Sequence, residues 1–102
     1  MINISATPGY AYQEVIADGE NGETVVVNPI YGKPLTCTLV AGASTGKVQF
    51  CTSPLANITA GTETWQDWDG VTTGTGTDVL VGSVTAVRGV STSGEVTVEF
   101  VY

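Results

Sequence analysis

The sequence predicts an all-β fold, a small antiparallel β-sandwich or barrel formed by residues 1–102 as a single domain. Threonine and valine are the commonest of the 102 residues, with sixteen and fifteen copies. Both are stiff at χ1 and favour strands. Turn-forming residues recur about every eight to twelve positions, which is typical of sandwiches and barrels. No segment of ten or more residues has a helical period of apolar side chains, so a helical bundle is excluded.

The first half of the chain contains two pairs of strand-like segments. Residues 11–16 are rich in apolar side chains, and Asp-Gly and Asn-Gly turn signals follow before residues 23–28, which centre on three valines. Residues 35–40 alternate between apolar and polar side chains, and residues 47–52 follow after a short turn. Each pair is predicted to form a β-hairpin.

The second half begins irregularly and ends with the strongest strand signal. Residues 53–61 break the rhythm of strands. Residues 78–90 are rich in valine, and Gly82 and Gly89 within this run indicate a bulge or bend. A turn at Thr92-Ser93-Gly94 is followed by alternation, with Val96, Val98 and Phe100 on one side and Thr97 and Glu99 on the other.

Whether the two cysteines can form a disulfide depends on how the strands 35–40 and 47–52 pair. A turn centred on Ser44 puts Cys37 directly opposite Cys51, close enough for the sulfurs to approach. A register shifted by one residue puts Cys51 on the opposite face and matches apolar side chains better. The second register, and the lack of a visible signal peptide, predict two free cysteines. At least Cys37 is then a small buried hydrophobe.

Composition excludes much chemistry. Without histidine there is no Ser-His-Asp or Cys-His nucleophile and no imidazole ligand, and two cysteines leave a zinc shell incomplete. The net charge of −7, with Lys33, Lys47 and Arg88 scattered singly, speaks against nucleic acid and against an anionic membrane. No apolar run approaches a span of about 20 residues. We expect no enzyme activity, no cofactor and no metal in a chain made in the cytoplasm.

Three loops resemble binding motifs at first sight. The segment 42–47 has one residue too few between its glycines for a phosphate-binding loop, and valine follows its lysine. Asp18, Glu20 and Asn21 depart from the calcium-loop spacing. Both segments are therefore predicted to be turns. A third possible set of oxygen ligands consists of Asp67, Asp69 and Asp78. A hydrolase could use a pair of carboxylates from among Glu14, Glu63, Asp67, Asp69 and Glu99. Nothing in the sequence indicates that the members of either set face a shared cleft.

Trp65 and Trp68 are the most informative side chains. Their spacing puts them on opposite faces of a strand or on one side of a turn. One can plug the end of the core while the other is presented to a partner, because tryptophan is enriched at interface hot spots. The alternative is that both lie in the core or at its rim.

Arg88 interrupts an apolar strand and shares a face with Val84 and Ala86 by alternation. We predict that it pairs with a carboxylate at a sheet edge or subunit boundary, because an unpaired buried charge is costly. The last strand runs to Tyr102 with no polar tail, so it can add to a partner's sheet edge or pair internally. Residues 1–7 are a second candidate arm.

Residues 64–102 resemble small structural proteins of tailed bacteriophages. The resemblance rests on Trp65-Gln66-Asp67-Trp68-Asp69-Gly70, on a Thr/Gly-rich loop before the strand from Leu80 to Arg88, and on a Ser93-Gly94 hairpin before Val96-Thr97-Val98. Chain length and β character are also similar to head decoration or cement proteins. The resemblance implies a virion protein on the capsid surface, bound to the major capsid protein and to copies of itself as a homotrimer.

This function has two alternatives. One is a carbohydrate- or receptor-binding module of a tail fibre or spike, and the other is a tail-tube, baseplate or connector component. In the sugar-binding alternative the aromatic side chains stack on sugars while two carboxylates hold hydroxyl groups (Tyr10, Tyr12, Tyr31, Trp65 and Trp68, with Asp67 and Asp69). For the interface itself the predicted residues are Trp65, Trp68, Arg88, Phe100 and Tyr102.

Overall fold

The computed structural model describes residues 2–3, 11–27, 35–68, 76–80 and 84–101. The elements run in chain order as β1 (Ile2–Asn3), β2 (Ala11–Ile16), β3 (Val25–Val26), β4 (Leu35–Val40), β5 (Thr45–Cys51), α1 (Leu55–Ala60), β6 (Gln66–Asp67), β7 (Gly76–Leu80), β8 (Ala86–Ser93) and β9 (Val96–Val101). None of the described helices is long and apolar enough to cross a membrane.

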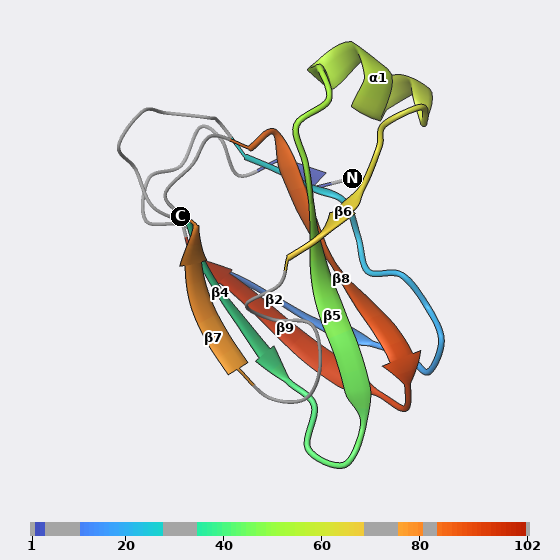
Figure 1. Cartoon of the computed structure of the whole chain (residues 1–102), viewed down its shortest axis with the longest axis vertical. Coiled ribbons are helices and arrows are strands. Elements are labelled where there is room, and N and C mark those ends of the chain that lie inside the picture. The colour runs from blue at the N-terminus through green and yellow to red at the C-terminus, as the bar shows by residue number, and fades with distance from the viewer. Residues whose placement is uncertain (1, 4–10, 28–34, 69–75, 81–83, 102) are drawn as a thin grey trace.

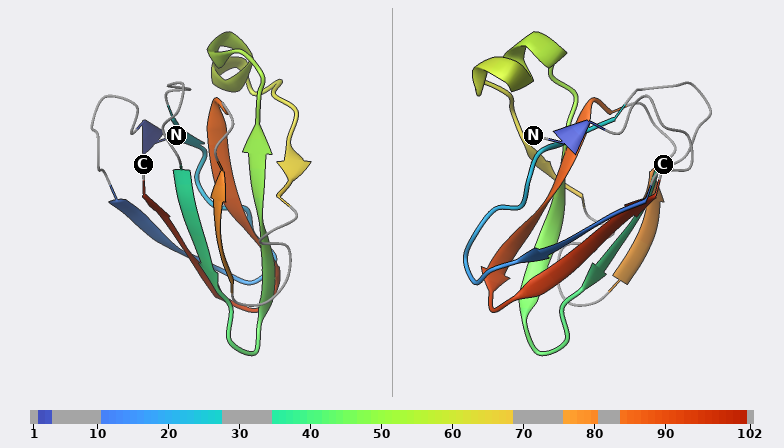
Figure 2. Two further views of the ribbon diagram at one scale, coloured as in Figure 1. Left: turned by 60° about the vertical axis from the view of Figure 1, so that its left-hand side comes forward. Right: turned by 180° about the vertical axis from the view of Figure 1, so that it is seen from behind.

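Two sheets form the molecule. The first, sheet A, has the strand order β1-β3-β8-β5-β6, and the second, sheet B, has the order β2-β9-β4-β7. All pairings are antiparallel except the short parallel pair of β1 and β3. The sheets face each other, converging at the lower end of Figure 1 and diverging toward α1 (Figure 2). The predicted all-β fold is confirmed, and it is a sandwich.

The predicted hairpins are all wrong for the same reason. β2 and β3 lie in different sheets, as do β4 and β5, and so do β8 and β9 on either side of the Ser93-Gly94 turn. Each turn therefore carries the chain from one sheet to the other. Alternation specifies which residues face the core but not which strand supplies the hydrogen-bond partner. The valine-rich run 78–90 is likewise split between β7 and β8.

The main core lies between the sheets. The side chains of β9 that the alternation assigned to one face, Val96, Val98 and Phe100, are buried there, while Glu99 is exposed. They pack with apolar side chains from both sheets (Ile16, Val25, Val27, Leu35, Cys37, Leu39, Ala41, Val48, Trp68, Val84 and Val87). Because β9 pairs with β2 on one side and β4 on the other, it is an interior strand.

Two glycines let the sheets approach closely at the narrow end. A methyl group built on Gly89 of β8 would lie 2.5 Å from Cγ1 of Val98 and 2.6 Å from Cδ1 of Ile16, both in sheet B. A methyl group on Gly46 of β5 would lie 2.8 Å from the carbonyl oxygen of Val90 and 3.1 Å from Cγ1 of Val96. Gly89 therefore marks a close approach of two sheets, and the register shift lies instead between Thr45 and Gly46.

A second, smaller core covers the outer side of sheet A. The segment between β5 and β6 leaves the sheet, forms α1 and returns, and Ile58 of α1 is buried against Val26, Cys51 and Ala86, with Trp65 beside them. Gly61 ends the helix in a left-handed conformation, with φ of 75°. The Pro54 and Gly61 that flank this helix are the sequence signal for it, and the helix of 6 residues is too short to show a period.

Both cysteines are free and Cys37 is buried, as predicted, and Cys51 is buried as well. Cys37 belongs to the main core, and Cys51 belongs to the smaller core on the outer side of sheet A. The predicted separation of the two thiols onto different faces is thus correct, although the strands that carry them are in different sheets. The turns at Ala41–Ser44 and Ala17–Glu20 are also confirmed, with backbone N–H to C=O distances of 2.8 Å and 3.1 Å.

Candidate functional site

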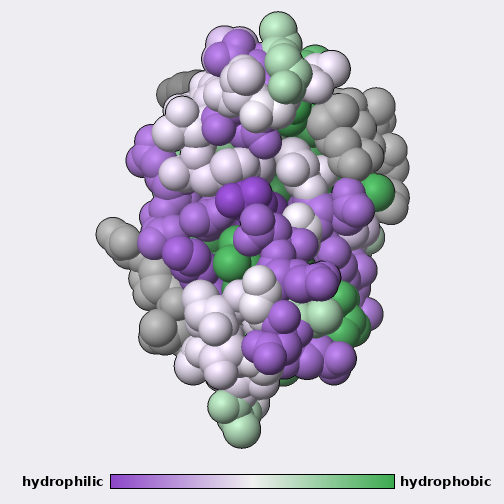
Figure 3. Space-filling view, turned by 90° about the vertical axis from the view of Figure 1, so that its right-hand side faces the viewer, coloured by the Kyte–Doolittle hydropathy of each residue, from purple (hydrophilic) through white to green (hydrophobic). Residues whose placement is uncertain are grey.

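A row of polar side chains crosses the outer face of sheet A. In the strand register, Gln49 of β5 lies opposite Arg88 of β8 on one side and opposite Asp67 of β6 on the other. Directly opposed residues of antiparallel strands project to the same face, so these three side chains form one line across three strands. Lys47 shares this face, two residues before Gln49. Hydrophilic side chains dominate the middle of the side shown in Figure 3.

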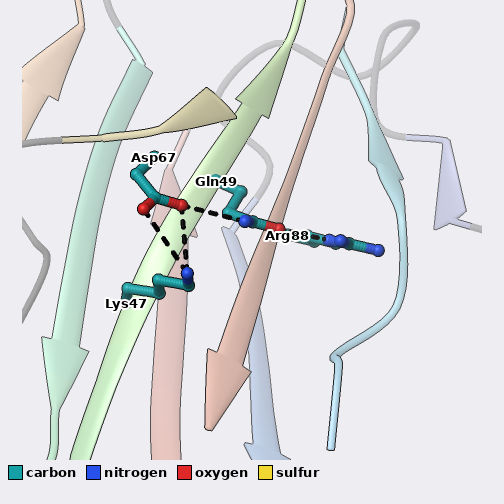
Figure 4. Close-up of polar contacts among 4 residues, drawn as sticks. All are labelled: Lys47, Gln49, Asp67 and Arg88. Carbon is teal, nitrogen blue, oxygen red and sulfur yellow. Dashed lines mark hydrogen bonds and ion pairs between the residues drawn. The ribbon is translucent and has the colours of Figure 1, made fainter. Parts of the chain in front are cut away.

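Hydrogen bonds fix each side chain of this row (Figure 4). Arg88 donates from Nε to Oε1 of Gln49 at 2.9 Å, and Gln49 donates from Nε2 to Oδ1 of Asp67 at 2.9 Å. Lys47 forms an ion pair with Asp67, with Nζ 3.2 Å from Oδ1. The amide of Gln49 is thus oriented by a charged group at each end. The amide connects the arginine to the carboxylate, and each bond constrains the next.

Trp65 supports Arg88 from a second direction. The guanidinium carbon of Arg88 lies 4.4 Å from the centroid of the Trp65 ring, a cation–π contact. The indole Nε1 of Trp65 donates to Oε1 of Glu63 at 3.2 Å. The other carboxylate oxygen of Glu63, Oε2, is buried without a hydrogen-bond partner among the described residues. Ring and amide together therefore fix the position of the Arg88 guanidinium.

The ionisation of this row follows from its contacts. Hydrogen bonds from Gln49 and Lys47 hold the pKa of Asp67 below its usual value, since both stabilise the carboxylate. Burial lowers the pKa of Arg88, and the nearby negative charge of Glu63 opposes that change. An arginine still remains protonated at neutral pH. The face therefore presents a charged, partly desolvated guanidinium.

The arrangement leaves an edge of Arg88 for a partner. Only Nε of its side chain has a hydrogen-bond acceptor among the described residues, so Nη1 and Nη2 have none there. A guanidinium edge of this kind matches a carboxylate or a phosphate with two parallel bonds. The cluster thus has the chemistry of a recognition surface, with a fixed cation, an aromatic ring and an amide. It offers no nucleophile next to a base.

The five predicted interface residues are placed differently by the structure. Trp65 and Arg88 come together on the outer face of sheet A. Trp68 is 5% exposed and Phe100 is 0% exposed, so the chain's own core covers both side chains, and neither offers a surface to a partner. Tyr102 lies outside the described residues. Of the two tryptophans, Trp68 packs in the main core and Trp65 lies at the rim of the smaller one.

The expectation that Arg88 lies at a sheet edge is wrong, and its position at a subunit boundary stays a prediction. β8 is the central strand of sheet A, so Arg88 is not at a sheet edge. Its direct partners are an amide and a ring in place of a carboxylate, and the acidic neighbours Asp67 and Glu63 act through Gln49 and through space. The sequence alone did not single out Gln49. Its outward position next to Lys47 in an alternating strand was the available signal.

The other predicted sets are not brought together. Tyr12 packs against the main core, and Tyr10, Tyr31 and Asp69 lie outside the described residues, so only Trp65 and Asp67 of the sugar-binding set share a surface. Among the carboxylates, Glu14 and Glu99 belong to strands of sheet B. Asp18 accepts a hydrogen bond from the backbone N–H of Gly94 at 2.8 Å. No group of three potential metal ligands occurs within the described ranges.

Comparisons with known proteins show similarity in fold alone. No family model matches the chain, and no curated protein matches it either. Among solved structures, the capsular polysaccharide assembling protein CapF from Staphylococcus aureus matches 92% of this chain with a TM-score of 0.52 and 9% identity. The chain spans 24% of the CapF chain. The IMPa metallopeptidase is more distant, with a TM-score of 0.47 and 14% identity. That match covers 91% of this chain and 12% of the IMPa chain.

Proposed function

We propose that this chain is a structural protein of a tailed-bacteriophage virion that decorates the capsid, binds the major capsid protein and copies of itself, and stabilises the shell without catalysis. The resemblance of residues 64–102 to such proteins is the starting point, and it implies a trimer. The observation that carries the proposal is the Trp65–Arg88 pair, which is held on an outward sheet face by Gln49. The sandwich supplies the rigid support that a shell component needs.

Side chains that are fixed before binding lower the entropic cost of forming an interface. Tryptophan and arginine are the residues that most often dominate the energy of protein interfaces. Ordering a long side chain on binding costs roughly 0.5–1.5 kcal/mol, and a side chain already fixed in the free protein avoids most of that cost. Arg88 is fixed by its ring contact and its Nε hydrogen bond. Its remaining donors are thus preorganised for an acceptor on the partner.

The distribution of charge also favours the outer face of sheet A as the docking surface. The chain has ten acidic and three basic residues, and two of the basic ones, Lys47 and Arg88, lie on the outer face of sheet A. Lys33, the third, lies outside the described residues. Asp67 and Glu63 lie beside these two cations, so the face is close to neutral, and a partner that presents carboxylates meets less repulsion here than over the acidic remainder of the chain. We assign the capsid-binding role to this face, and we call it the Trp65 face.

Reconstituted particles test the proposal. Particles assembled without the chain are expected to lose their DNA at a lower temperature, and adding the purified protein restores the wild-type release temperature. Arg88→Ala and Trp65→Ala are expected to weaken binding to these particles at least tenfold. Glu99→Ala, on the far side of sheet B, serves as the matched control and binds normally. Equal heat resistance of particles with and without the chain would contradict the cementing role.

A sugar-binding module of a tail fibre or spike is the second candidate, favoured by the position of Trp65 beside Asp67 and Gln49. A ring next to hydrogen-bonding groups is the usual composition of a small-molecule site. A glycan array decides between the two candidates. Binding that disappears with Trp65→Ala supports a sugar, whereas a blank array removes this candidate. Trp68→Ala is unsuitable as a test because Trp68 is a core residue. A tail, baseplate or connector position would appear as density outside the capsid.

A further inference from the structure

The four outer edges of the two sheets differ in how well they are protected. Sheet A ends in β1 and β6, which are 2 residues long each. Sheet B ends in β2, with 6 residues, and in β7, with 5. A strand at an edge presents unpaired N–H and C=O groups, and proteins usually protect such edges with short strands, lysine, proline or a bulge. Sheet A uses short strands, and sheet B does not.

β2 lacks most of these protecting features, although Glu14 on its inward face is charged. Its sequence, Ala-Tyr-Gln-Glu-Val-Ile, contains no lysine and no proline. All six residues pair with β9 in one continuous register, so no bulge twists the edge away. No described strand pairs with its other side. Val15 on this strand is 58% exposed, the highest value among the large hydrophobic side chains that the structure describes. β2 is therefore a long, regular edge with an apolar side chain at the surface.

We propose that β2 pairs with β2 of a second copy of this chain, antiparallel and about a two-fold axis through Gln13. The inference rests on the self-association in the proposed function and names the surface that performs it. Gln13 then faces Gln13 of the second copy, and Ala11 faces Val15. The two four-stranded sheets become one sheet of eight strands. Alternate residues of β2 direct their backbone groups away from β9, and these groups form the new ladder.

Self-complementarity identifies the second copy as the partner. Opposed residues must lie on the same face of the sheet, so the axis has to pass through a residue and not between two residues. With the axis at Gln13, two amides pair, each offering both donors and an acceptor, and the small Ala11 leaves room for Val15. An axis at Glu14 would bring two like charges together. An axis at Val15 would shorten the overlap of the strands.

The single charge of β2 does not oppose this register. The carboxylate of Glu14 accepts hydrogen bonds from the backbone N–H of Glu23 at 3.0 Å and 3.2 Å, and from the hydroxyl of Tyr12 at 3.3 Å. The register sets Glu14 opposite Tyr12 of the second copy, so the two Glu14 side chains are not in direct opposition. Two copies of this acidic chain can therefore meet at β2 without directly opposed carboxylates. A two-fold pair replaces the trimer that the resemblance implies.

Light scattering after size exclusion, over a range of concentrations, tests the pairing with Gln13→Lys. The wild type is expected to reach the mass of a dimer. Gln13→Lys sets two lysines against each other at the axis and raises the dissociation constant at least tenfold. Gln66→Lys, at an exposed position on an edge strand of sheet A, is the matched control and leaves the dimer intact. A wild-type monomer at every concentration, or a dimer equally stable with Gln13→Lys, would overturn the pairing.

Cysteine crosslinking tests the register. Gln13→Cys places two thiols across the axis at a Cα separation of about 4.5–5.5 Å, which a disulfide can bridge. Val15→Cys places its two copies four residues apart along the strand, roughly 13 Å, so this variant is the matched control. The native thiols are buried and do not compete. Rapid dimer formation by Gln13→Cys alone supports the axis, and equal crosslinking by both variants refutes it.

The particle assay separates this inference from the proposed function. Capsid binding is assigned to the Trp65 face on sheet A, and self-pairing to the edge of sheet B. A protein that binds particles but never dimerises in solution or crosslinks through position 13 overturns the pairing alone. A protein that dimerises through position 13 but does not bind or stabilise particles overturns the capsid role and leaves the pairing supported.

Discussion

Gly89→Ala is the substitution that tests the packing of the two sheets most sharply, because the structure decides whether the free energy of unfolding rises or falls. In the interior of a strand, replacing glycine by alanine stabilises by roughly 0.5–1 kcal/mol when there is room for the methyl group. At Gly89 there is no room. The added carbon would lie 2.5 Å from Cγ1 of Val98 and 2.6 Å from Cδ1 of Ile16. The free energy of unfolding should therefore fall.

The size of the effect follows from which neighbours can move. The Cδ1 atom of Ile16 ends a flexible side chain, but Val98 is stiff at χ1 and lies on the interior strand β9, so the sheets have to separate slightly. Overpacking of this kind costs about 1–3 kcal/mol, and the glycine effect offsets up to about 1 of it, which leaves a net loss of about 1–2 kcal/mol. The midpoint of thermal unfolding then drops by about 4–8 °C per kcal/mol.

Urea unfolding followed by tryptophan fluorescence measures this change, and Val98→Ala supplies the control. Removing the two γ-methyl groups of Val98 makes space for the methyl group at position 89. The double variant Gly89→Ala/Val98→Ala should therefore be more stable than the sum of the single changes implies, with a coupling of about 1 kcal/mol or more. Additive effects, or a Gly89→Ala variant as stable as the wild type, would refute the close approach of the sheets at this point.

Three further predictions concern single groups. The hydrogen bonds from Gln49 and Lys47 hold the pKa of Asp67 below its ordinary value, so its contribution to stability is present above the ordinary pKa and is lost as the pH falls through the lowered one. Gln49→Ala should therefore raise the midpoint of the Asp67 titration seen by carboxyl NMR, and an unchanged midpoint would contradict the hydrogen bond. Cys37 and Cys51 should resist a thiol reagent in the folded protein and both react in urea, and a fast reaction of either thiol without denaturant would contradict their burial. Phe100→Ala should cost about 3–5 kcal/mol in urea unfolding, since its side chain is fully buried, and a loss below 1 kcal/mol would place it at the surface.

The strands and their buried faces were predictable from the sequence because alternation is a local property. The segment 35–40 was predicted with the bounds of β4, and 11–16 with those of β2. The partners of these strands were not predictable. A short turn can join two neighbours in one sheet or carry the chain across to the other, and both arrangements bury the same side chains. Gly46 and Gly89, which favour crossing by removing side chains where the sheets converge, look like ordinary turn or bulge glycines in the sequence.

The candidate site was predictable in part. Trp65 and Arg88 stood out as an aromatic and a charge within apolar or acidic surroundings, and the structure brings them together. Their meeting depends on β6 returning beside β5 after the excursion through α1, which no local pattern encodes. Gln49 became important only through the register that opposes it to both Asp67 and Arg88. Phe100 belongs to the core because it projects from the face of β9 that packs against sheet A, whereas Glu99 on the same strand projects to the other face and is exposed.

The most direct test of the account is the cryo-EM density of the purified virion. We expect the sandwich on the capsid surface, with the Trp65 face against the major capsid protein and the acceptor for Arg88 supplied by a carboxylate of that protein. Density with this face turned to solvent, a position in the tail, or the absence of the chain from the particle would contradict it.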